Sequence, residues 1–354
     1  MTSAGELRRR TLESLSRPSY SIASRDMLLL NDNANLFGTN PAVAEVAGSF
    51  DFSRLWAYPS ENSDSLRERI ASEFGVDTGE VIVGNGSDEL LDMACKSFIN
   101  PGDAFCSPSP TFSMYKFYAR VNLARIVEKP LGPGFSLDAG PILSEGAKLT
   151  ALCQPNNPTG GLFDAREVSR VLSESVGVVL LDEAYADFCG SDMLREALSA
   201  PCAIDTRTLS KAYGMAGLRA GFAIARKEVV DELRRVRTPF GLNSFTEAVA
   251  IRALDHRRWV DEKAAEMRRE RANLRSRMDS MGFQTLPSEC NFVTARCPAE
   301  GTPFVAALRA RGVAVRDCSS MPMLEDYIRV TVGPRWMMDK FVAEAESAIS
   351  GGAP

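Results

Sequence analysis

Seven short apolar runs recur in the chain up to residue 225 and limit its possible folds more than any other feature. Runs such as VIVGN (81–85) and VGVVLL (176–181) are apolar without alternation, and helical patterns separate the runs. A strand that is apolar on both sides must be covered on both faces, as in a parallel sheet between layers of helices. The sequence therefore predicts an α/β fold with a mostly parallel sheet of the seven-stranded type. The predicted strands are 81–85, 104–108, 124–130, 148–155, 176–184, 202–209 and 221–225.

The pattern changes after about residue 240, where a long charged amphipathic helix is predicted at 259–282. Short strands and helices then alternate in a second, smaller α+β domain. Its predicted strands are 291–296, 313–317 and 327–333, and its predicted helices include 304–312 and 336–349. We expect three parts: an N-terminal arm over residues 1–40 that packs elsewhere, a large α/β domain over 41–255, and a small C-terminal α+β domain over 256–354.

The composition excludes several classes of function. A net charge of -5 gives no indication of nucleic acid or an anionic membrane as a partner. No apolar run approaches the ~20 residues that span a bilayer, and the opening MTSAGELRRR lacks the apolar segment of a signal peptide. We therefore expect a cytoplasmic protein. The eight cysteines form no CxxC pair and His256 is the only histidine, so we predict no metal site and no Ser-His-Asp triad.

Polar and charged residues gather at the carboxyl ends of the predicted strands. Asp182 and Tyr185 end one strand (VVLLDEAY), Lys211 follows another, and Asn157 lies in the rigid loop QPNNPTGG. Phe112 follows the strand at 104–108. Gly86, Ser87 and Asp88 form a strand-to-helix turn that favours an anion, although such a turn also occurs without any ligand. Because the carboxyl ends of strands in an open α/β sheet meet at one crevice, we expect these residues to lie together.

This set of groups fits one ligand. Two hydroxyl residues, Thr208 and Ser210, precede Lys211, and a glycine-rich segment that ends in Arg219 follows it. These groups form a typical phosphate environment. A buried Asp182 needs a cationic partner, such as a protonated ring nitrogen or Mg²⁺. The Mg²⁺ alternative of a nucleotide site fails because the chain has no G-x-x-x-x-G-K-[ST] loop. An amine, a carboxylate, an aromatic plate and an anion pocket together indicate pyridoxal phosphate (PLP).

The same motifs resemble those of the fold-type I PLP-dependent aminotransferases. The segments GNGSDELL, PNNPTG, LLDEAY, TLSKAYGMAGLRAGF and YIRVTVG occur in the order and approximate spacing of that family. The similarity covers nearly the whole chain, from about Tyr20 to the last helix, and is greatest to the histidinol-phosphate aminotransferases. It implies the PLP-dependent transferase fold of type I and a homodimer whose two active sites are shared between subunits.

The resemblance also implies roles for individual residues. Lys211 would bind the cofactor covalently and then move a proton, and Asp182 would pair with the ring nitrogen. Tyr185 and Asn157 would bind the ring hydroxyl, and Phe112, where many relatives have tyrosine, would stack on the ring. The phosphate would lie among Gly86, Ser87, Asp88, Thr208, Ser210 and Arg219, with Tyr58 contributed by the neighbouring subunit.

The resemblance is less specific for the substrate. Arg329 matches the arginine that binds a substrate carboxylate, and Tyr20 and Arg316 match residues that bind the phosphate of histidinol phosphate. An alternative for Arg316 is a salt-bridged strand residue. Asn33 lies in NDNANLFG, the segment near the substrate. That segment differs from histidinol-phosphate enzymes in two places, where Ala34 replaces an acidic residue and Leu36 replaces a proline.

We therefore predict a transaminase that moves an amino group from histidinol phosphate to 2-oxoglutarate through pyridoxamine phosphate, as in histidine biosynthesis. Aromatic or other amino-acid donors, including those of secondary metabolism, are the near alternative. A PLP-dependent decarboxylase or oxidase of the same fold would keep every cofactor residue. A non-catalytic regulator domain is disfavoured by the intact Lys211 and by a strand–helix pattern that begins too early to leave room for a DNA-binding domain.

Overall fold

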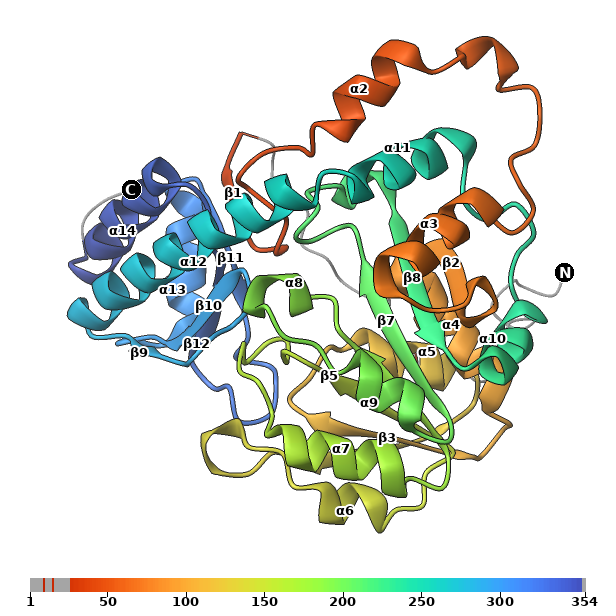
Figure 1. Cartoon of the computed structure of the whole chain (residues 1–354). Coiled ribbons are helices and arrows are strands. Elements are labelled where there is room, and N and C mark those ends of the chain that lie inside the picture. Colours follow the sequence, from red (N-terminus) through yellow and green to blue (C-terminus); the bar gives the residue numbers. More distant parts are fainter. Residues whose placement is uncertain (1–8, 10–14, 16–25, 352–354) are drawn as a thin grey trace, which may run out of the picture.

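The computed structural model describes residues 26–351, together with Arg9 and Leu15. Two β-sheets organise this part of the chain, a larger one and a smaller one near the carboxyl terminus (Figure 1). The predicted fold class, an α/β architecture with a mostly parallel seven-stranded sheet and a smaller α+β part, is confirmed.

All seven runs of the predicted large sheet form strands. In spatial order they are β2 (Val81–Asn85), β8 (Ala220–Ala225), β7 (Ala203–Thr208), β6 (Val178–Asp182), β5 (Leu149–Cys153), β3 (Ala104–Ser109) and β4 (Arg125–Pro130). Five of them, β3 to β7, run parallel, whereas β8 is antiparallel to both β7 and β2. The carboxyl ends of β5, β6 and β7 therefore lie at one edge of the sheet, as predicted.

Helices cover both faces of this sheet. Consecutive residues of β6 point to opposite faces: Leu180 packs in one apolar cluster, and Val179 and Leu181 pack in another. Residues of α4 (Ser87–Phe98), α5 (Met114–Val121) and α10 (Lys227–Arg234) belong to the first cluster. Residues of α6 (Ala139–Leu143), α7 (Ala165–Glu174) and α9 (Leu194–Ser199) belong to the second. Burial on both faces explains why the strand sequences are apolar without alternation.

The remaining elements of this part lie around the sheet. The α-helices are α2 (Ala42–Ser49), α3 (Asp64–Phe74), α8 (Ala186–Cys189) and α11 (Ser244–Leu254). The single-turn 3-10 helices are η2 (Phe52–Arg54), η3 (Thr78–Glu80), η4 (Pro133–Phe135) and η5 (Ala216–Leu218). α2 and the segment after it form the outermost part of the chain in Figure 1.

The smaller sheet has the order β1 (Leu28–Leu30), β11 (Val313–Asp317), β12 (Tyr327–Thr331), β10 (Phe292–Arg296) and β9 (Gln284–Thr285). Helices α12 (Arg257–Ser280), α13 (Gly301–Ala310) and α14 (Arg335–Ile349) lie beside it (Figure 1). The predicted strands at 291–296, 313–317 and 327–333 are all present. The short strand β1 pairs in parallel with β11, so residues that precede the large sheet in the sequence complete the small one.

The division into residues 1–40, 41–255 and 256–354 stays a proposal. One apolar cluster includes Leu30 of β1, Phe222 of β8 and Phe341 of α14, so the core is continuous between the two sheets. No helix within the described residues has the length and apolar character needed to cross a membrane.

Candidate active site

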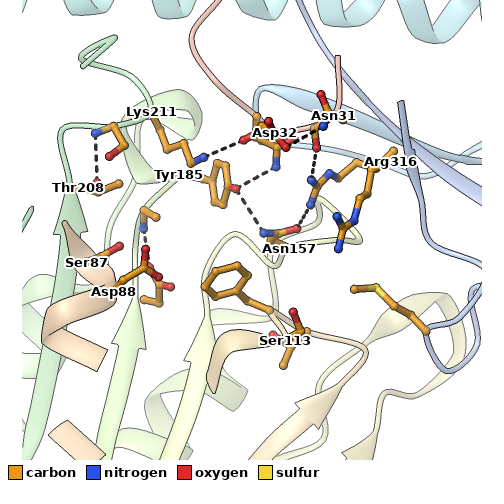
Figure 2. A pocket seen from close by; sticks show the side chains of 18 of the residues that line it. Asn31, Asp32, Ser87, Asp88, Ser113, Asn157, Tyr185, Thr208, Lys211 and Arg316 are labelled. Carbon is orange, nitrogen blue, oxygen red and sulfur yellow. Dashed lines mark hydrogen bonds between the residues drawn. The ribbon is translucent and has the colours of Figure 1, made fainter. Parts of the chain in front are cut away.

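A cavity of about 310 Å³ lies where the carboxyl ends of the central strands face the small sheet. Thirteen of the predicted site residues line it: Asn33, Ser87, Asp88, Phe112, Asn157, Asp182, Tyr185, Thr208, Ser210, Lys211, Arg219, Arg316 and Arg329. Figure 2 shows that Lys211, Tyr185 and Asn157 point toward the centre of the cavity, with Ser87 and Asp88 at one end and Arg316 at the other. The topology thus brings residues that are far apart in the sequence to one place.

Asp182 lies at the end of β6 and is 4% exposed. Its Oδ2 accepts a hydrogen bond from the Tyr115 hydroxyl at 2.6 Å, and its Oδ1 accepts one from the Ala184 backbone N–H at 3.0 Å. Burial raises the pKa of Asp182 to about 6, whereas these two donors lower it. Within the described residues, no cationic side chain forms an ion pair or hydrogen bond with Asp182. The carboxylate can therefore receive a cationic N–H group from a ligand.

Lys211 follows β7, and its Nζ donates to the backbone carbonyl of Asp32 at 3.1 Å. Desolvation and, to a smaller extent, the positive charge of Arg329 lower the pKa of Lys211 to about 8. A lysine with this pKa is partly uncharged near neutral pH. Its amine can therefore act as a nucleophile and as a base, which an ordinary surface lysine cannot do efficiently.

Tyr185 is the centre of a hydrogen-bond network. Its hydroxyl oxygen accepts from Asn33 Nδ2 at 3.0 Å and from Asn157 Nδ2 at 3.4 Å. Burial raises the pKa of Tyr185 well above its ordinary value, so the hydroxyl stays protonated. Because both neighbours donate to its oxygen, the hydroxyl proton of Tyr185 is left to donate to an oxygen atom of a ligand.

Two arginines approach the cavity from the small sheet. Arg329 on β12 donates to Asn157 Oδ1 at 2.5 Å and to the Asn31 carbonyl at 2.9 Å, while its buried Nε has no hydrogen-bond partner among the described residues. Its guanidinium also lies 5.2 Å from the centre of the Phe292 ring. Arg316 on β11 lines the same cavity, and the described residues provide it with no salt bridge. The alternative of a salt-bridged strand residue thus finds no support in this part of the chain.

An anion pocket lies at the opposite end of the cavity. It is formed by the first turn of α4, by Thr208 and Ser210, and by Arg219, which pairs with Asp88 Oδ2 at 2.9 Å. Two glycines allow these groups to approach. A Cβ at Gly86 would lie 2.4 Å from the Arg219 guanidinium, and a Cβ at Gly221 would lie 2.5 Å from the Ser87 backbone nitrogen. Hydroxyls, a guanidinium and the start of a helix are suited to a phosphate group.

The sequence matches the family described as "Aminotransferase class I and II" over residues 25–344. The chain belongs to this aminotransferase family. It is 39% identical over 297 residues to a histidinol-phosphate aminotransferase of Thermococcus gammatolerans, with 83% of each chain covered. It is 35% identical over 347 residues to one of Sinorhizobium fredii, with 97% of this chain and 93% of the relative covered.

Solved structures show the same fold. The histidinol-phosphate aminotransferase of Sinorhizobium meliloti, in complex with pyridoxal-5'-phosphate, matches with a TM-score of 0.86 at 23% identity, covering 97% of this chain and 98% of that one. The enzyme of Clostridium acetobutylicum matches with a TM-score of 0.85 at 22% identity, covering 92% and 100%. The predicted family, the aminotransferase activity and PLP as the cofactor are thereby confirmed.

The residues that line the cavity of this aminotransferase fit the chemical groups of PLP. Asp182 is a buried carboxylate to which the described part of the chain provides no cationic partner, Tyr185 has a proton to donate, and Lys211 has an amine of lowered pKa. Phe112 presents an aromatic ring at the cavity wall, and the anion pocket lies at the far end. These are the groups that a protonated pyridine ring with a hydroxyl, an aldehyde and a phosphate requires.

Two of the predicted residues that the structure describes do not line the cavity. Gly86 lies behind it, against Arg219. Tyr58 is 82% exposed and stacks on Phe240 with ring centres 4.9 Å apart. Tyr20 is outside the described residues. Conversely, sequence reasoning missed six residues of the cavity wall: Asn31, Asp32, Thr111, Ser113, Ala184 and Met321. It also missed Tyr115, which lies behind Asp182 and whose contact with that carboxylate has no signal in the local sequence.

Proposed function

We propose that this aminotransferase moves the amino group of histidinol phosphate to 2-oxoglutarate, as in histidine biosynthesis. The observation that carries the proposal is the pair of guanidinium groups, Arg316 and Arg329, in the same cavity as Lys211. Each acceptor or donor molecule in this reaction has an anionic group to bind: histidinol phosphate has a phosphate, and 2-oxoglutarate has two carboxylates. The names of the relatives at 35–39% identity support the same substrate.

The proposed chemistry uses residues of the chain as follows. Lys211 would hold the cofactor through its amine, and its free Nζ would take the proton from the substrate Cα and carry it to the other side of the site. When bound, PLP accepts the electron pair that remains at Cα in its protonated ring. Asp182 keeps the ring nitrogen protonated, and Tyr185 and Asn157 hold the ring hydroxyl. Release of the keto product before the keto acid binds gives a ping-pong reaction.

The remaining contacts hold the cofactor and the substrates. Phe112 would stack on the ring, and Ser87, Asp88, Thr208, Ser210 and Arg219 would bind the cofactor phosphate, with Gly86 leaving space for Arg219. Arg329 would bind the α-carboxylate of the keto acid by a bidentate pair, and Arg316, with Asn33 and Tyr20, would bind the other end of the substrate.

We further propose a homodimer with shared active sites. Tyr58 is exposed and does not line the cavity of its own subunit, and it lies in a segment that also exposes Phe52, Leu55 and Trp56. An apolar surface of this kind is typical of a protein interface. In the proposed dimer, Tyr58 reaches the cofactor phosphate of the partner subunit. The cytoplasmic location stays a prediction.

A screen of amino donors tests the proposed function. The PLP-loaded enzyme is mixed with histidinol phosphate, phenylalanine, tyrosine or glutamate, and the cofactor absorbance and the products are followed. We expect histidinol phosphate to change the cofactor absorbance and to yield a keto product. Glutamate should form after 2-oxoglutarate is added. A response only to aromatic amino acids would assign the alternative donor. The aromatic amino acids are included because Ala34 replaces an acidic residue of the histidinol-phosphate enzymes. The cavity wall contains Asp32 and Asn33 but not Ala34. Carbon dioxide or peroxide would indicate a decarboxylase or an oxidase.

A further inference from the structure

Tyr115 makes the shortest hydrogen bond to the carboxylate that faces the cofactor ring. It lies on α5, is 2% exposed, and its hydroxyl donates to Asp182 Oδ2 at 2.6 Å. Burial and the nearby carboxylate raise the pKa of Tyr115 well above its ordinary value. The phenol therefore keeps its proton and acts as the donor. A hydrogen bond from a neutral donor to an ionised carboxylate is stronger than one between neutral groups.

We propose that Tyr115 is a positioning residue of the PLP site, whose hydroxyl keeps Asp182 ionised and aimed at the pyridine nitrogen. It acts through Asp182 and does not itself line the cavity. The inference rests on the proposed role of Asp182. Tyr115 is not among the site residues predicted from the sequence.

The surroundings of Asp182 make this hydrogen bond important. Burial opposes the charged carboxylate, and Asp88 on α4 and Asp205 on β7 add to that effect by their negative charges. Cys153, the partner of Asp182 in the β5–β6 register, is a buried thiol and provides no positive charge. Among the described residues, only the Tyr115 hydroxyl and the Ala184 N–H donate to the Asp182 carboxylate and act against these effects. The loss of one of two donors should therefore favour the neutral acid.

The position of Tyr115 also connects two parts of the cofactor site. Its ring meets that of Phe112 edge to face, with centres 5.4 Å apart and planes at 82°. Its backbone N–H donates to the Phe112 carbonyl at 3.3 Å. The residue that faces the ring plane and the residue that holds Asp182 thus belong to one turn of the chain. This turn fixes the Asp182 carboxylate relative to the Phe112 ring.

The test uses Tyr115→Phe, which keeps the buried ring and removes only the hydroxyl. The matched control is Tyr118→Phe on the same helix, where the ring packs edge to face against Phe117. Each holoenzyme is prepared with PLP labelled with ¹⁵N in the ring, and the ¹⁵N chemical shift reports whether that nitrogen is protonated. The dissociation constant of PLP is measured by titration of the apoenzyme.

We expect Tyr115→Phe to move the ¹⁵N shift toward the unprotonated value and to weaken PLP binding by roughly tenfold, the scale of a lost hydrogen bond to a charged group. We also expect kcat to fall while KM for the amino donor stays within about twofold of wild type, because Tyr115 does not contact the substrate. Tyr118→Phe should leave the ¹⁵N shift and PLP affinity unchanged. A purely structural role would lower the unfolding midpoint of Tyr115→Phe without moving its ¹⁵N shift, and that result would overturn the proposal.

Two further variants separate the possible failures. Asp182→Asn should move the ¹⁵N shift at least as far as Tyr115→Phe. If Asp182→Asn leaves the shift unchanged, the proposed role of Asp182 is wrong; if only Tyr115→Phe leaves it unchanged, the inference about Tyr115 is wrong. Should Tyr115→Phe fail to fold, 3-fluorotyrosine at position 115 provides the test. As a more acidic phenol it should strengthen the hydrogen bond and tighten PLP binding, and unchanged binding would contradict the proposal.

Discussion

Arg316 and Arg329 are direct partners in the antiparallel register of β11 and β12, so two guanidinium groups enter one cavity from neighbouring strands. Arg329 is held by Asn157 and by the Asn31 carbonyl, whereas Arg316 has no salt bridge within the described residues. We therefore expect the two arginines to bind different groups of the substrates. The fixed arginine is suited to the group that is common to all keto acids, and the free one to the variable end of the substrate.

Replacing Arg329 by Gln should therefore affect the two half-reactions differently. Histidinol phosphate has no carboxylate, so its half-reaction should change little. In contrast, kcat/KM for 2-oxoglutarate should fall by the factor that corresponds to a loss of about 2–5 kcal/mol in transition-state binding. Arg316→Gln should lower kcat/KM for histidinol phosphate. Single-turnover absorbance measurements with each substrate check both outcomes, and Arg258→Gln on the exposed face of α12 is the control. An equal loss in both half-reactions for each variant would contradict this assignment of the two arginines.

The lowered pKa of Lys211 gives a pH-dependent prediction. The free amine is the reactive form, and desolvation together with Arg329 lowers the pKa of Lys211 to about 8. The rate at which the apoenzyme incorporates PLP should therefore rise as the pH increases through about 8 and level off above it. The comparison is an N-acetyl-lysine amide, whose rate should keep rising toward the ordinary lysine pKa of about 10.4. Because the charge of Arg329 contributes to the shift, Arg329→Gln should move the inflection to higher pH. An inflection of the wild-type rate near pH 10 would show that the amine is solvated like a surface lysine.

The shared active site can be tested by mixing two inactive subunits. Lys211→Ala would lack the proposed covalent anchor, and Tyr58→Ala would lack the proposed contact with the partner's cofactor phosphate. In a mixed dimer, one site receives intact Lys211 from one subunit and intact Tyr58 from the other. After denaturation and refolding of an equal mixture, we expect about a quarter of the wild-type activity, since half of the dimers are mixed and each has one intact site. Activity no greater than the mean of the two parents would place Tyr58 in its own subunit's site or outside any site.

The residues of the site differ in how well the sequence predicts them. Lys211, Asp182 and Asn157 were predictable because each directly follows an apolar strand, and parallel strands bring such residues together. Asn31, Asp32 and Tyr115 were missed because their roles depend on contacts that no local pattern encodes. The Asn31 carbonyl meets Arg329 at a sequence separation of 298, and Tyr115 meets Asp182 at a separation of 67.

The same reasoning applies to the fold. The apolar strands of the large sheet were predictable because burial on both faces determines their composition. β1 and β9 have only three and two residues, so they are too short for a periodic signal. Their pairing with β11 and β10 is decided by the tertiary structure. The antiparallel direction of β8 likewise depends on the short connection from β7 through η5, which leaves no room for a crossover helix.

A buried ion cluster behind the active site provides the last prediction. Arg207 on β7 donates to Glu183 at 2.5 Å and to Asp205 at 3.1 Å, and the three side chains are 8%, 1% and 0% exposed. The Arg207 guanidinium also lies 5.0 Å from the centre of the Phe74 ring. Arg207→Met would leave two buried carboxylates without their cation. Breaking a buried pair in this way typically costs about 3–5 kcal/mol of unfolding free energy.

The cost should depend on pH in a defined direction. Burial and the negative charge of Asp205 raise the pKa of Glu183, and Arg207 opposes that rise. In the variant, the pKa of Glu183 therefore rises further above its value in the unfolded chain. The folded variant then binds more protons than the unfolded one, so its stability falls as the pH rises above the ordinary carboxyl range. Urea unfolding of Arg207→Met should therefore show a larger loss relative to wild type at pH 8 than at pH 5.5. Arg170→Ala, which removes exposed pairs with Glu167 and Glu174 on α7, should change the free energy of unfolding by at most about 1 kcal/mol at either pH. A loss for Arg207→Met that is equal at both pH values would show that the cluster acts through packing against Phe74 rather than through charge.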